Sequence, residues 1–101
     1  MLEVEVAIPP RVRLAGVEKT VKAACDRAGL HLTLIGTLAK YPGCVHWHFK
    51  HGAERGTLEI TFWKTERRLW FKVTAGRKAK WIETVIPSLR RVLEKELKRN
   101  A

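Results

Sequence analysis

The chain has 101 residues, of which 46% are hydrophobic and 30% are charged, and its formal net charge is +10 at pH 7. This size and composition indicate one globular domain over residues 1–101 with its own core, and exclude a disordered chain. The apolar runs are too short to span a membrane, so we expect no membrane partner. The N-terminal segment carries Glu3 and Glu5 but no basic region, which favours a cytoplasmic protein over a secreted one.

Residues 2–8 alternate between apolar and polar side chains, which predicts a strand that ends at Pro9. Over residues 16–28 the apolar positions recur with helical spacing, and Gly29 suits the end of that helix. The position of the first strand stays open. It could pair beside 30–38, beside 68–74, or with another chain.

Four more strands are predicted over about 30–38, 44–50, 57–63 and 68–74, with turns at 41–43, 51–56 and 64–67 between them. Pairing these strands so that their apolar faces match puts His48 opposite Glu59 and places Gly36 beside Trp47. Residues 78–99 form an amphipathic pattern whose apolar stripe keeps its phase across Pro87, which predicts one kinked helix.

These elements predict an α+β fold with the order β-α-β-β-β-β-α. We expect a two-layer sandwich in which two helices cover one face of an antiparallel sheet of four to five strands. The opposite face of the sheet is then open, unless a second subunit covers it.

The residues predicted on that outward face are aromatic and basic instead of the usual polar mixture. Aromatic side chains that stack on bases, combined with cations that hold phosphates, are typical of proteins that bind single-stranded nucleic acid or RNA. We therefore expect a small basic domain that binds nucleic acid without catalysis. The predicted contact residues are Trp63, Trp70, His46, His48, Lys50, Arg68, Lys72, Arg77, Lys78 and Lys80.

The alternative is a homodimeric interaction domain of another function, joined through the outward face or through strand 2–8. A third interpretation is a metal or catalytic site at His46, His48 and Glu59. Zinc usually has three or four protein ligands, and a His-x-His pair is common by chance. The sequence therefore assigns no metal, no cofactor, no catalytic residue and no family. Cys25 and Cys44 are expected to be reduced thiols, with Cys25 in the core.

Overall fold

The structure is a computed structural model that describes residues 2–100. Its helices and strands, in chain order, are β1 (Leu2–Val6), α1 (Val17–Arg27), β2 (His31–Gly36), β3 (Val45–Lys50), β4 (Leu58–Trp63), β5 (Arg68–Val73) and α2 (Lys80–Arg99). Short 3₁₀ turns at Leu14–Gly16, Lys64–Glu66 and Ala75–Arg77 connect some of them.

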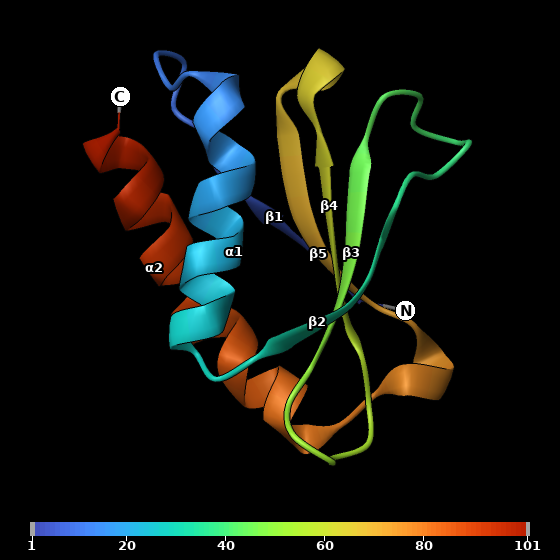
Figure 1. The fold of residues 1–101 in the computed structure, drawn as a ribbon. Helices are drawn as coiled ribbons and strands as arrows, with labels where there is room; N and C mark the ends of the chain where they lie inside the picture. The colour runs from blue at the N-terminus through green and yellow to red at the C-terminus, as the bar shows by residue number, and fades with distance from the viewer. Residues whose placement is uncertain (1, 101) are drawn as a thin grey trace.

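The five strands form one antiparallel sheet in the order β1-β5-β4-β3-β2. Both helices lie on the same side of this sheet, and they run next to each other across it (Figure 1). The predicted α+β sandwich and element order are confirmed. Of the three positions left open for the first strand, the structure selects the one beside β5.

The strand registers follow the predicted pairing with one exception. His48 lies opposite Glu59 in the β3–β4 pair, as predicted. Between β2 and β3 the prediction is wrong by one residue at the loop end of the pair, and a register shift between Leu32 and Leu34 adds a second residue of difference toward His31. Ile35, and not Gly36, therefore lies opposite Trp47. A bulge of this kind adds one residue to a strand without leaving a mark in the alternation of its side chains.

The core fills the space between the helices and the inward face of the sheet. The side chains of Trp47, Ile60 and Phe71 are wholly buried there, and so is Cys25 on α1. α2 is a single helix that contains Pro87, in agreement with the sequence. Burying this apolar surface supplies most of the free energy that favours folding.

The outward face of the sheet is partly covered by the chain itself. The loop between β2 and β3 places the Tyr41 ring 5.1 Å from the Trp63 ring and 5.0 Å from the Trp70 ring, measured between centroids. The indole N–H of Trp63 donates a hydrogen bond of 2.9 Å to the Pro42 carbonyl. The guanidinium of Arg68 lies 4.6 Å from the centroid of the Trp70 ring. Trp70 is consequently only 2% exposed, so the expectation of two accessible indoles on an open face is wrong for Trp70.

Candidate metal site on the outward face

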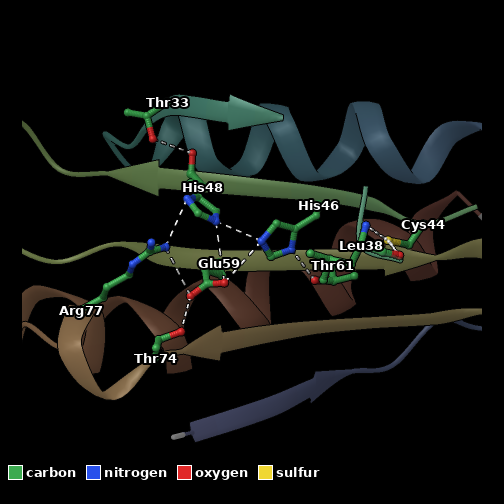
Figure 2. A network of polar contacts seen from close by, with 9 residues as sticks. All are labelled: Thr33, Leu38, Cys44, His46, His48, Glu59, Thr61, Thr74 and Arg77. Carbon is green, nitrogen blue, oxygen red and sulfur yellow. Dashed lines mark hydrogen bonds and ion pairs between the residues drawn. The ribbon is translucent and has the colours of Figure 1, made fainter. Parts of the chain in front are cut away.

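Two histidines and one carboxylate meet on the outward face at the middle of the sheet. His46 and His48 are two residues apart on β3, so their side chains lie on the same face, and Glu59 lies on β4 opposite His48. Figure 2 shows the two imidazoles and the carboxylate pointing toward one another. The Nε2 atoms of the two histidines are 3.0 Å apart, and Oε1 of Glu59 lies 3.3 Å from Nε2 of His46 and 3.7 Å from Nε2 of His48.

The three side chains of the cluster are largely buried, and their residues lie in regular strands. The side chains of His46, Glu59 and His48 are 5%, 9% and 16% exposed. All three residues lie within hydrogen-bonded strands, so the backbone fixes where each side chain starts. Sites built on regular elements hold their geometry better than sites built on loops.

Thr61 orients the first imidazole. Its Oγ1 atom lies 2.8 Å from Nδ1 of His46, and the threonine side chain is wholly buried. If Nδ1 carries the proton and donates to this hydroxyl, the lone pair of Nε2 faces Glu59 and His48. Histidines that bind metals are commonly held in this way, with the other ring nitrogen donating to a neighbouring acceptor.

Contacts to its second oxygen, Oε2, orient the carboxylate of Glu59. The hydroxyl of Thr74 donates a hydrogen bond to Oε2, and Nη1 of Arg77 lies 3.8 Å from the same oxygen. The first oxygen, Oε1, is thereby left to face the two histidines (Figure 2). The sequence placed Glu59 correctly, but the roles of Thr61 and Thr74 depend on side-chain distances that alternation does not encode.

Three atoms point into the cluster, Nε2 of His46, Nε2 of His48 and Oε1 of Glu59, and they carry too few hydrogens for all three to form hydrogen bonds with one another. A neutral imidazole carries one N–H, and two hydrogens cannot both point into the 3.0 Å gap between the Nε2 atoms of His46 and His48. Oε1 of Glu59, which is an acceptor, faces the same point. Three lone-pair atoms therefore share at most one hydrogen, an arrangement that a cation would satisfy.

Both imidazoles favour the neutral form. Burial lowers the pKa of His46, and the positive charges of His48 and Lys72 lower it further, against an opposing effect of Glu59. Burial also lowers the pKa of His48, where Glu59 raises it and Arg77 lowers it. Neutral imidazole is the form that binds metal ions.

The other predicted contact residues lie in different parts of the molecule. Arg68 pairs with Glu5 on β1, and Trp63 is half-buried against Tyr41. Lys50 and Lys72 are half-buried on the sheet face, whereas Arg77, Lys78 and Lys80 are exposed before and at the start of α2. The structure thus separates the predicted surface into a covered aromatic group, a polar cluster and an exposed basic segment.

Comparison of the chain with protein-family models, with curated proteins and with solved structures gives no match in any of the three. Among the described residues, no helix combines the length and apolar composition needed to cross a membrane. The function therefore has to be argued from the geometry of the site.

Proposed function

We propose that this domain binds a divalent transition-metal ion at His46, His48 and Glu59. The observation that carries the proposal is the triangle of Nε2, Nε2 and Oε1 atoms. Bonds of about 2.0–2.1 Å to a metal place neighbouring ligand atoms about 3.0–3.4 Å apart. Two of the three separations, 3.0 and 3.3 Å, lie in that range, and the third, 3.7 Å, needs to shorten by about 0.3 Å.

The donor set narrows the choice of metal. Two imidazoles and one carboxylate suit zinc, and the same set binds iron(II) in other proteins, whereas calcium and magnesium prefer oxygen ligands only. Three protein ligands leave a coordination position free, as in zinc sites that bind a water or another exogenous ligand. We take zinc as the reference ion. This proposal revises the expectation from the sequence, which assigned no metal.

The test is isothermal titration of untagged, chelator-treated protein with Zn²⁺. We expect one ion per chain. The variants His46→Ala, His48→Ala and Glu59→Gln each remove one ligand. Their zinc affinity should fall by more than the roughly 10–100-fold that loss of an outer-shell partner causes.

The matched control is His51→Ala. His51 also pairs with a carboxylate, that of Glu54, but its side chain is 46% exposed and lies outside the cluster. Zinc binding should survive this substitution, and circular dichroism should show that all four variants are folded. Absence of zinc binding, or a zinc affinity that is unchanged in all three ligand variants, would overturn the proposal.

A second proposed function, attraction to nucleic acid through phosphates, has support from the charge distribution. Lys78 and Lys80 are exposed and make no ion pair with a carboxylate within residues 2–100. The net charge of +10 favours polyanions. Stacking on Trp70 does not belong to this proposal because that ring is covered.

Free thiols at Cys25 and Cys44 support the proposed cytoplasmic location.

Homodimerisation, the alternative role, has support from edge strand β2. This strand pairs only with β3 in the described chain, and it exposes Leu32, Leu34 and Ile35 by 42%, 46% and 53%. Such an apolar edge favours pairing with a second copy. Sedimentation equilibrium should then show a dimer that Ile35→Lys dissociates. A monomer at all concentrations would reject this role.

A further inference from the structure

The proposed metal site has one outer-shell contact that does not fit a metal-bound histidine. Nη1 of Arg77 lies 3.5 Å from Nδ1 of His48 (Figure 2). In the metal-free cluster this contact is favourable if Nδ1 carries no proton and the guanidinium points its N–H toward the lone pair. The remaining proton of His48 then lies on Nε2, facing His46.

Metal binding reverses this arrangement. A metal on Nε2 of His48 leaves the single proton of the neutral ring on Nδ1. Nδ1 then becomes a donor, and it faces the guanidinium of Arg77, which is a donor only. Two donors at 3.5 Å need an acceptor that both can reach. Histidines bound to metals ordinarily find this acceptor in a carboxylate, a carbonyl or water.

Besides His48, the one acceptor that the Arg77 guanidinium approaches among residues 2–100 is Oε2 of Glu59, and it lies beyond hydrogen-bond distance. Oε2 of Glu59 already accepts from Thr74, and it lies 3.8 Å from Nη1 of Arg77. The Arg77 side chain is 47% exposed, so solutes reach it. Its backbone is anchored, because the Arg77 N–H donates to the Thr74 carbonyl at 2.8 Å and the Arg77 carbonyl accepts from Thr57 at 3.1 Å.

Resting on the proposed metal site, we propose that metal binding creates an adjacent site for a phosphate group, between Arg77 and Nδ1 of His48. The phosphate oxygens would accept from both donors. A divalent metal with Glu59 carries a net +1, and Arg77 and Lys72 add two further positive charges. Lys72 lies opposite Glu59 on β5. A phosphate dianion balances most of this charge, and arginine pairs with phosphate through two parallel hydrogen bonds.

The experiment titrates inorganic phosphate into the protein with and without one equivalent of Zn²⁺. Phosphate should bind the zinc-loaded protein at least about 10-fold more tightly than the metal-free protein, which is a coupling of ordinary size between two sites. By reciprocity, zinc affinity should rise by the same factor in the presence of phosphate. Arg77→Ala should abolish the coupling, so that its zinc affinity is the same with and without phosphate, although its zinc affinity should start lower because Arg77 also lies beside Oε2 of Glu59.

Lys78→Ala is the matched control, since Lys78 is the exposed cation next in the chain, and it should keep the coupling. A 5′-phosphorylated oligonucleotide, compared with the same oligonucleotide without the phosphate, distinguishes a terminal phosphate of nucleic acid from the free ion. If zinc binds but phosphate affinity does not change, this inference fails while the metal site stands. If zinc does not bind, the metal proposal itself fails.

Discussion

At the scale of single residues, the metal proposal depends on side chains that do not themselves bind the ion. The hydroxyl of Thr61 fixes which nitrogen of His46 faces the cluster. Valine has nearly the same shape without the hydroxyl, so Thr61→Val leaves His46 free to change its tautomer. We expect zinc affinity to fall about 10–100-fold, the usual effect of losing an outer-shell partner.

Thr33→Val is the control for this prediction. Thr33 also contacts His48, but its hydroxyl donates to the backbone carbonyl and not to the ring. Isothermal titration should show unchanged zinc affinity for Thr33→Val. Equal losses in both variants would mean that Thr61 acts through general stability and not through the His46 ring.

A second prediction at this scale concerns the buried thiol of Cys25. Burial raises the pKa of this thiol from 9.0 to about 12. Above pH 9.0 the unfolded chain loses the proton while the folded chain keeps it, so folding binds more protons and stability falls with rising pH. Below pH 9.0 the thiol is protonated in both states and has no such effect.

Urea unfolding at pH 8 and pH 10 measures this contribution. The wild-type free energy of unfolding should fall by about 1.4 kcal/mol more than that of Cys25→Ala over this interval, because the unfolded thiol titrates at 9.0 and one pH unit above it corresponds to about 1.4 kcal/mol. Cys25→Ala will be less stable at both values, since it leaves a small cavity. Equal pH dependence in the two proteins would contradict the raised pKa.

At the scale of elements, the turn before β4 depends on Gly56. This residue has a φ of +99°, and a Cβ atom there would lie 2.5 Å from Cβ of Ala79 and 3.1 Å from the Arg77 carbonyl oxygen. Gly56→Ala should therefore lower the free energy of unfolding by about 2 kcal/mol or more, from backbone strain together with the clash.

Gly36→Ala provides the comparison, because a Cβ at Gly36 meets nothing within 4 Å. Chemical unfolding should show a change below about 0.5 kcal/mol for this variant. If Gly56→Ala is equally mild, the 3₁₀ turn at Ala75–Arg77 and the start of α2 must move more easily than the structure indicates.

The sequence predicted the elements well because strands and helices have periods that side chains record. Alternation located β3, β4 and β5 and placed His46 and His48 on one face. It did not reveal the bulge in β2, which changes pairing without changing local pattern. It also missed that Tyr41 covers the indoles, since the path of a loop follows from tertiary contacts that have no period.

At the scale of the whole molecule, the excess of cations predicts binding to polyanions with strong dependence on salt. Each phosphate contact made by Lys or Arg releases a counterion, so affinity falls as salt rises, with a slope set by the number of contacts. If the segment at the start of α2 makes these contacts, the double variant Lys78→Ala/Lys80→Ala should bind single-stranded RNA more weakly. The slope of the logarithm of affinity against the logarithm of salt concentration should also become shallower by about 2, one for each lost phosphate contact.

The comparison that decides this prediction is Lys19→Ala/Lys22→Ala, which removes the same charge from α1. Both of these lysines are exposed, so neither substitution should disturb the core. Fluorescence polarisation across a range of salt concentrations would measure affinity and slope for the three proteins. If the two double variants lose the same affinity, net charge alone attracts the RNA and no particular surface receives it. A loss confined to Lys78→Ala/Lys80→Ala would place the RNA at the segment that leads into the start of α2.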